Sequence, residues 1–183
     1  MVHAGVDQTG VTQLVLVGLM GAGKSTIGRI VADRLGRQLV DTDDAIQHRT
    51  GKSVRELWER GGEAAYRALE SSVVVDALRD ATPLVVAAPG GVVLDPAARH
   101  AMKDAFVVWL DVDPSILATR VRPDDHRPLL GRDPRAVLST MAVEREHLYR
   151  EVADTIIELG DDIDPATAAQ QVIDAFDRGD TAR

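Results

Sequence analysis

The stretch Gly18–Ser25 reads Gly-Leu-Met-Gly-Ala-Gly-Lys-Ser, and it decides the fold class of this chain of 183 residues. It fits the pattern G-x-x-x-x-G-K-[ST], in which a glycine-rich backbone bends around a phosphate and aims successive N–H groups at it. An apolar run that suits a buried parallel strand, Leu14–Val17, comes directly before it. Apolar residues at helical spacing follow it, namely Ile27, Ile30, Val31 and Leu35. Because a glycine turn without a ligand does not require this order of strand, loop and helix, we predict a nucleotide-binding loop.

Each part of this loop has its own expected task. The backbone N–H groups and the dipole of the following helix favour phosphate oxygens. Lys24 would reach the β- and γ-phosphates, and the Ser25 hydroxyl would hold Mg²⁺. The residues of the loop that we expect to bind ATP are Gly21, Ala22, Gly23, Lys24, Ser25 and Thr26.

The composition limits the partners of the chain. The formal net charge is −8, which argues against a nucleic acid or an anionic membrane as partner. There is no cysteine, so disulfides, thiolate metal sites and a cysteine nucleophile are excluded. No apolar run is long enough to span a bilayer, and Met1–Gly10 lacks the basic start and apolar core of a secretory leader. We therefore expect a cytoplasmic protein with small-molecule partners, and we expect a monomer.

Five apolar runs alternate with helical segments along the chain. This alternation predicts an α/β fold with three layers, in which helices cover both faces of a five-stranded parallel sheet. We expect one domain at residues 12–176, with loosely ordered tails at 1–10 and 177–183. Ligands of such sheets bind beyond the carboxyl ends of the strands, where the loop of Gly18–Ser25 also lies. The expected strands are Leu14–Val17, Gln38–Asp41, Leu84–Ala88, Phe106–Leu110 and Thr155–Glu158.

Helix starts are indicated by two devices. Aspartate caps a helix because its carboxylate accepts free N–H groups of the first turn, and proline suits the next position, which needs no N–H partner. Ser53 followed by Glu56 fits a capping box, and we expect a short helix there. The aspartate-proline pairs are Asp95-Pro96, Asp113-Pro114, Asp133-Pro134 and Asp164-Pro165.

Two segments interrupt the alternation. Residues 42–75 carry no pattern of a core strand and are mostly helical, and we interpret them as a substrate-binding subdomain. Residues 121–134 are polar, bear prolines and are rich in arginine, and we interpret them as a lid.

Two carboxylates follow the second expected strand, in the run Asp41-Thr42-Asp43-Asp44. Phosphoryl transfer to a hydroxyl needs a metal to neutralise charge and a group that orients the hydroxyl and takes its proton. Asp41 could help to hold Mg²⁺, and Asp43 could be the base. The alternative is a solvated acidic turn in which Asp43 or Asp44 caps a helix. Next to a phosphate-binding loop, we favour the functional interpretation.

Three arginines are candidates for anion recognition. Arg67 could be structural, because Glu63 and Glu70 lie at helical spacing from it. Arg145 lies on an apolar face of a helix expected over residues 139–153, and a cation there needs a buried anion or a cleft. Its planar fork suits a carboxylate. Arg127, in the expected lid, could stabilise the transferring phosphoryl group, although most arginines of this kind are solvated.

The chain resembles the shikimate kinase family over residues 12–176. The phosphate loop alone occurs in many kinases, whereas the combination of the other motifs is far more specific. Those motifs are Asp41-Thr42-Asp43, Arg67 in a Tyr-Arg-x-x-Glu setting, a glycine turn after the third strand, Arg127-Pro128-Leu129-Leu130 and Arg145 followed by Leu148-Tyr149.

The resemblance implies a fold like that of nucleoside monophosphate kinases and MgATP-dependent phosphorylation of the 3-hydroxyl of shikimate. By position, Asp43 would orient the shikimate hydroxyls, and Arg67 and Arg145 would grip its carboxylate. The Gly90 and Gly91 backbone would contact the ring hydroxyls. In addition, Arg127 would assist the transfer from the lid, Arg120 would stack on adenine, and Trp58 and Tyr66 would line the pocket.

The chain also departs from the family pattern. The family turn is usually three glycines, whereas this chain has Pro89-Gly90-Gly91, and proline removes one N–H. Trp58 is larger than the usual phenylalanine. These departures leave two alternatives open: a related kinase for another hydroxylated acid or cyclitol, such as a gluconate kinase, or a nucleotide-binding module without catalysis.

Overall fold

The computed structural model describes residues 12–121 and 133–179. The strands are β1 (Leu14–Val17), β2 (Gln38–Asp41), β3 (Leu84–Ala87), β4 (Phe106–Asp111) and β5 (Thr155–Glu158). The helices are α1 (Lys24–Leu35), α2 (Thr42–Thr50), α3 (Val54–Leu78), α4 (Pro96–Ala101), α5 (Pro114–Arg120), α6 (Pro134–Val152) and α7 (Pro165–Arg178). Short 3-10 turns, η1 (Val92–Leu94) and η2 (Met102–Asp104), flank α4.

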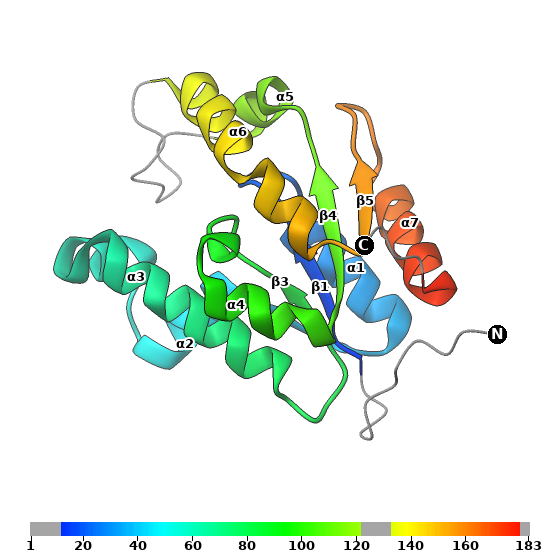
Figure 1. Cartoon of the computed structure of the whole chain (residues 1–183), viewed down its shortest axis with the longest axis horizontal. Coiled ribbons are helices and arrows are strands. Elements are labelled where there is room, and N and C mark those ends of the chain that lie inside the picture. Colours follow the sequence, from blue (N-terminus) through cyan, green and yellow to red (C-terminus); the bar gives the residue numbers. More distant parts are fainter. Residues whose placement is uncertain (1–11, 122–132, 180–183) are drawn as a thin grey trace.

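The strands form one parallel sheet in the order β2-β3-β1-β4-β5. Helices α1 and α7 pack together on one face, and α3, α4 and α6 cover the other (Figure 1). This is the three-layer α/β architecture that the alternating pattern predicts, and all five expected strands are present within a residue of their expected ends.

The register of the sheet brings three loops to one edge. Leu16 of β1 pairs with Ala87 of β3, and Asp41 of β2 pairs with the same Ala87. The three strands therefore end at nearly the same level. As a result, the phosphate loop, the start of α2 and the turn at Pro89-Gly90-Gly91 all leave the sheet at its carboxyl edge, as expected from the sequence.

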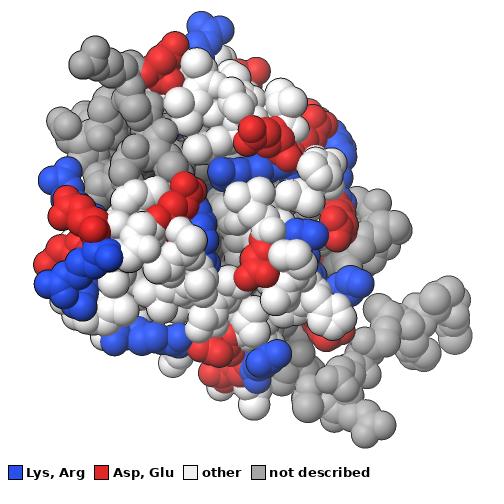
Figure 2. Space-filling model, turned by 60° about the vertical axis from the view of Figure 1, so that its left-hand side comes forward, with Lys and Arg blue, Asp and Glu red and all other residues white. Residues whose placement is uncertain are grey.

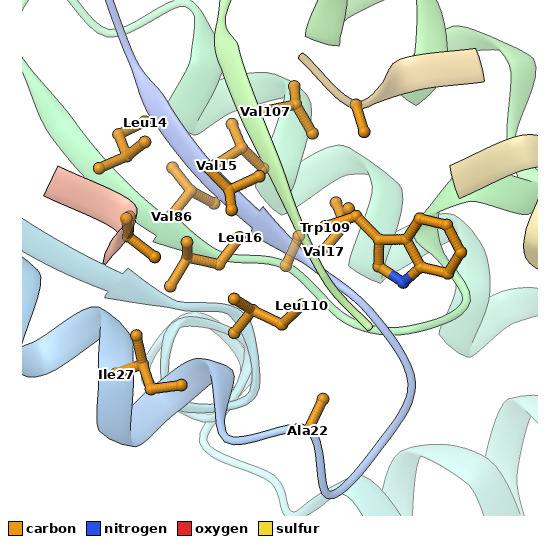
Figure 3. Close-up of a cluster of buried hydrophobic side chains, with 14 of the residues drawn as sticks. Leu14, Val15, Leu16, Val17, Ala22, Ile27, Val86, Val107, Trp109 and Leu110 are labelled. Carbon is orange, nitrogen blue, oxygen red and sulfur yellow. The ribbon is translucent and has the colours of Figure 1, made fainter. Parts of the chain in front are cut away.

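The core is aliphatic and centred on β1, whose four residues are completely buried (Figure 3). Ile27 of α1 and Leu110 of β4 belong to the same cluster as β1. The strand before the phosphate loop and the helix after it are therefore both packed into the core. A second, smaller cluster of Ile46, Tyr66 and Val73 joins α2 to α3. This cluster joins the two helices of the segment interpreted above as a substrate-binding subdomain at residues 42–75, which stays a prediction.

The helix caps follow the sequence closely. Each of the four aspartates that precede a proline caps its helix, and Ser53 with Glu56 forms the predicted capping box. However, the helix after Ser53 is not short, because α3 has 25 residues. Helical residues continue on both sides of Gly62, whose left-handed φ of 71° introduces a kink instead of an end.

Two further boundaries differ from the expected ones. Helix α6 begins at Pro134, where the pair Asp133-Pro134 predicts a helix start, so the segment 139–153 expected to carry Arg145 covers only the later part of this helix. Helix α7 runs to Arg178, so Asp177 and Arg178 are helical instead of part of a loose tail, and Gly179 ends the helix in a left-handed conformation. Most of the expected lid, including Arg127, lies outside the described residues. Within the described parts of the chain, no helix is long and apolar enough to cross a membrane.

Candidate active site

Positive φ angles shape the phosphate loop. Gly18, Gly21 and Gly23 have φ values of 141°, 82° and 92°, which side-chain-bearing residues rarely adopt. A Cβ atom on Gly18 would also lie 2.5 Å from the Leu110 carbonyl oxygen. Gly23 precedes α1 and offers no side chain to cap it, so the N–H groups of the first turn of α1 remain available to an anion.

Lys24 lies folded over this loop. Its Nζ atom donates to the carbonyl oxygens of Gly18 at 2.9 Å and Leu19 at 2.8 Å. The ammonium group therefore lies on the rim of the loop, where phosphate oxygens would accept from it in place of these carbonyls.

Asp41 caps helix α2. Its Oδ1 atom accepts from the backbone N–H of Asp43 at 3.1 Å, so the alternative in which Asp43 or Asp44 is the cap is wrong. The next residue, Thr42, is buried, and its hydroxyl donates to the Ala87 carbonyl at 3.1 Å. These two bonds fix the start of α2 against the end of β3, and they thereby fix the backbone position of Asp43.

Asp43 receives a hydrogen bond from Tyr66. The Tyr66 hydroxyl donates to Asp43 Oδ1 at 3.1 Å, and Tyr66 itself is only 4% exposed. The Trp58 ring packs against it, with centroids 5.7 Å apart. Burial first, and then the charge of Asp43, raises the pKa of Tyr66, so its hydroxyl stays a donor. Trp58 and Tyr66 thus form the side of the cleft next to Asp43.

Arg67 is held by two glutamates and lies against the glycine turn. Its Nη1 atom lies 2.6 Å from Glu70, and its Nε atom lies 3.5 Å from Glu63. A Cβ atom on Gly91 would meet the Arg67 guanidinium at 2.7 Å, so only glycine allows this approach. Glu70 is 4% exposed, and burial raises the pKa of its carboxyl while Arg67 opposes that shift.

Arg145 is buried, and its guanidinium forms no ion pair with a carboxylate in the described parts of the chain. The residue is 6% exposed, and its Nη1 atom donates to the Gly90 carbonyl at 3.2 Å. Its Nε atom has no hydrogen-bond partner, and Arg145 forms no ion pair within residues 12–121 and 133–179. The Tyr149 hydroxyl donates to the same Gly90 carbonyl at 2.7 Å. The expected face of α6 is confirmed, because Met141 and Tyr149 are buried with Arg145.

The glycine turn connects the acceptor arginines to the phosphate loop. A Cβ atom on Gly90 would lie 2.9 Å from the Gly18 carbonyl oxygen and 3.4 Å from the Leu19 Cα atom. The Pro89 carbonyl accepts from Val92, which closes the turn. The N–H groups of Gly90 and Gly91 donate to no acceptor in the described parts of the chain, so both remain available to a ligand.

Cavities lie on both sides of Arg145 along α6. One of about 340 Å³ is lined by Glu63, Met141 and Arg145, among others. A larger one of about 630 Å³ lies between α6 and the ends of β4 and β5, and its polar lining includes Asp111 and Glu146. Acidic and basic side chains are interspersed over the face of the molecule that Figure 2 shows, with neither charge prevailing across its described residues.

Arg120 and two oxygen donors, Ser25 and Asp41, are the remaining residues expected on the nucleotide side. Arg120, at the end of α5, donates to the carbonyl oxygens of Gly160 at 3.2 Å and Asp161 at 3.0 Å, so it bridges α5 and the loop after β5. The Ser25 hydroxyl and the Asp41 carboxylate are hard oxygen donors and suit Mg²⁺. The described residues contain no cluster of three or more histidine, cysteine or acidic side chains that could hold a metal ion.

Two residues of this arrangement were not predicted as functional from the sequence. Glu70 was considered only as a helical partner of Arg67, yet it is buried beside Asp43 and Arg145 as well. Tyr149 was noted in the motif in which Arg145 is followed by Leu148-Tyr149, with no task of its own. Its spacing of four residues from Arg145 was visible in the sequence, but the carbonyl that both of them bind lies in a distant turn.

The phosphate loop at the end of β1, with a carboxylate and two arginines in the adjoining cleft, defines a P-loop kinase for a small molecule. The family model for shikimate kinase matches residues 20–177. A shikimate kinase from Halorhodospira halophila is 44% identical over 149 residues, which cover 80% of this chain and 84% of the relative. Another from Aromatoleum aromaticum is 46% identical over 149 residues, covering 80% and 85%. The chain belongs to the shikimate kinase family.

Solved structures agree with this assignment. A shikimate kinase from Acinetobacter baumannii in complex with shikimate superposes with a TM-score of 0.87 at 32% identity, and the match covers 92% of this chain and 94% of that one. A gluconokinase from Sinorhizobium meliloti has a TM-score of 0.61 at 16% identity over 92% and 93% of the two chains. This second likeness shows only that the fold is shared.

Proposed function

We propose that this chain transfers the γ-phosphoryl group of ATP to the 3-hydroxyl of shikimate. The observation that carries the proposal is Arg145, a buried guanidinium without a carboxylate partner within the described residues. A buried cation is costly unless an anion accompanies it, and a planar fork suits a ligand carboxylate. Arg67, across the glycine turn at Gly90-Gly91, would bind the other side of the same carboxylate.

The cleft supports separate tasks for its polar groups. Asp43 would orient the acceptor hydroxyl and take its proton, while the hydroxyl oxygen forms a bond to the γ-phosphorus. The bond between that phosphorus and the β–γ bridging oxygen breaks, and ADP leaves with the electron pair. Lys24 and the N–H groups of the phosphate loop would stabilise the charge that develops on the phosphate oxygens. The N–H groups of Gly90 and Gly91 would donate to the oxygen atoms of the ring hydroxyls.

We further propose that Mg²⁺ accompanies ATP, held by Ser25 and Asp41, where it neutralises phosphate charge. Arg120 would stack on the adenine, and Arg127 would act from the lid. We also propose that the protein works as a monomer in the cytoplasm. Pro89 has little effect on acceptor binding in this proposal, because the N–H groups needed are those of the two following glycines.

An ATP-coupled assay tests the function directly. ADP release is measured with shikimate, gluconate, quinate and a neutral cyclitol, each at millimolar concentration, with an ATP-only control. We expect turnover with shikimate that exceeds turnover with every other acceptor by at least about 100-fold, because two charged contacts and several hydroxyl contacts select it. No release with shikimate, together with turnover on another acid, would show that the chain is a kinase for a different acceptor.

A further inference from the structure

The chain has only two tyrosines, and both are buried. Their hydroxyls donate to different partners. The Tyr66 hydroxyl binds the Asp43 carboxylate, whereas the Tyr149 hydroxyl binds the Gly90 carbonyl. The two bonds therefore act on two different groups that would meet the acceptor.

The Tyr66 bond fixes one oxygen of the Asp43 carboxylate. Asp43 lies in the first turn of α2, and its side chain is exposed, so a hydrogen bond from a buried donor restricts how its carboxylate can turn. The phenol ring is 4% exposed and packs on Trp58, which gives the donor a fixed position. With Oδ1 bound at 3.1 Å, the orientation of Oδ2 is also determined. A base must lie within hydrogen-bond reach of the proton that it takes, so this bond bears on the chemical step.

The Tyr149 bond fixes the peptide of the glycine turn. Tyr149 is 1% exposed, and its ring stacks on Trp109 with centroids 5.4 Å apart and planes 22° from parallel. Its hydroxyl shares the Gly90 carbonyl with Arg145, so the carbonyl has two donors at fixed positions. If the carbonyl turned, the guanidinium of Arg145 and the peptide N–H groups around Gly90 would move with it. This bond therefore bears on how the acceptor is bound.

We propose that the two tyrosines are positioning residues with separate tasks, Tyr66 orienting the base Asp43 for the chemical step and Tyr149 holding the Gly90 turn and Arg145 for acceptor binding. The proposal rests on the proposed function, because it needs an acceptor that contacts both groups. Neither hydroxyl ionises during the reaction. Burial raises the pKa of Tyr149 to about 12 and raises that of Tyr66 as well, so both remain donors.

The test is a comparison of Tyr66→Phe with Tyr149→Phe, because each change removes one hydroxyl and keeps the ring. For Tyr66→Phe we expect kcat to fall about tenfold, with the KM of the acceptor within about twofold of wild type, since the lost bond is to an ionised carboxylate. For Tyr149→Phe we expect the KM of the acceptor to rise about three- to tenfold, with kcat within about twofold, since the lost bond is to a neutral carbonyl. The KM of ATP stays unchanged in both.

Thr50→Val is the matched control. It removes a hydroxyl that donates to the Ile46 carbonyl at 2.8 Å, on the same α2 helix as Asp43 but away from the cleft. The control separates a general loss of stability from a positioning effect, because thermal midpoints are measured for all three variants. We expect both kinetic parameters of Thr50→Val to match wild type. The proposal is overturned if the two tyrosine variants change the same parameter by the same factor, or if neither changes any parameter by more than about twofold.

Crystal structures of the two variants give a readout that needs no acceptor. Tyr149→Phe should displace the Gly90 carbonyl and leave the Asp43 carboxylate in place, and Tyr66→Phe should do the reverse. If wild type fails to phosphorylate shikimate, the proposed function fails, yet these two structures still decide the positioning proposal. If the Gly90 carbonyl and the Asp43 carboxylate keep their wild-type positions in both variants, the positioning proposal is wrong, whichever acceptor the protein uses.

Discussion

The nucleotide side and the acceptor side of the cleft are built in different ways. The phosphate loop is a single stretch of eight residues, Gly18–Ser25, and it would bind its ligand mainly through backbone N–H groups. The acceptor side is assembled from side chains of α2, α3 and α6 and from the turn after β3. The conformation of the phosphate loop depends mainly on the φ angles that its own glycines can adopt. By contrast, the acceptor side depends on buried hydrogen bonds between segments that are far apart in the sequence. We therefore predict that single substitutions on the two sides alter different kinetic parameters.

The largest effect is expected on the nucleotide side, from Lys24→Ala. Removal of the cation leaves the developing charge on the phosphate oxygens without its side-chain donor, so we expect kcat/KM to fall about 100- to 1000-fold with the fold retained. The coupled assay and the thermal midpoint measure this, with the exposed Lys103→Ala as the control. Activity of Lys24→Ala within tenfold of wild type would remove the distinction between the two sides.

The next largest effect is expected on the acceptor side, from Arg145→Ala. Loss of its charged hydrogen bonds should raise the KM of shikimate about 100-fold and leave the KM of ATP within about twofold. Arg150→Ala on the same helix is the control, since Arg150 forms a surface ion pair with Glu146 and lies over the Trp109 ring, with no contact to the Gly90 carbonyl, and its loss should have little effect on the KM of shikimate. An unchanged shikimate KM in Arg145→Ala would refute the role of this residue in acceptor binding.

A smaller effect on the same side is expected from Glu70→Gln. The change keeps the shape of the side chain but removes the charge that holds Arg67 at 2.6 Å, so we expect the KM of shikimate to rise about tenfold. Glu63→Gln is the matched control, because Glu63 is exposed and lies 3.5 Å from the same guanidinium. Equal effects of the two changes would mean that the burial of Glu70 does not matter to Arg67.

The smallest effect concerns stability as a function of pH. Burial raises the pKa of Glu70 above its ordinary value of 4.5, so the folded chain binds more protons at this group than the unfolded chain does in the window between the two pKa values. The free energy of unfolding should therefore fall as the pH rises through that window. Urea unfolding of wild type and Glu70→Gln across this range measures the difference, and the variant should show a flatter dependence. A parallel dependence in both proteins would contradict the raised pKa.

The two sides also differ in how far the sequence predicts them. The loop Gly18–Ser25, the five strands and the four aspartate caps depend on residues close in sequence, and all of them were predicted. The roles of Asp43 and Arg145 followed from their residue types and surroundings, the role of Arg67 came from the resemblance to a family, and all three stay predictions. By contrast, the bond from Tyr149 to the Gly90 carbonyl joins residues 59 positions apart, and no local pattern indicates it.

Local competition explains the remaining differences. Asp41, Asp43 and Asp44 are all suitable caps for α2, and the end of β2 at Asp41 decides between them, which is a property of the sheet. The short helix expected after Ser53 continues instead through a kink at Gly62, because helical residues lie on both sides of it. Glu70 has the spacing of an ordinary surface partner, and only the packing of α3 against the cleft makes it buried.

The charge of the acceptor tests most directly the claim that Arg67 and Arg145 bind its carboxylate. Shikimate and its carboxamide differ only in that charge, and the ratio of their kcat/KM values is measured for wild type and for Arg145→Ala. Two guanidinium groups that bind a carboxylate predict a preference for shikimate of at least about 100-fold in wild type and a much smaller preference in the variant. Equal kcat/KM values for the two acceptors in wild type, or the same ratio in both proteins, would contradict the account.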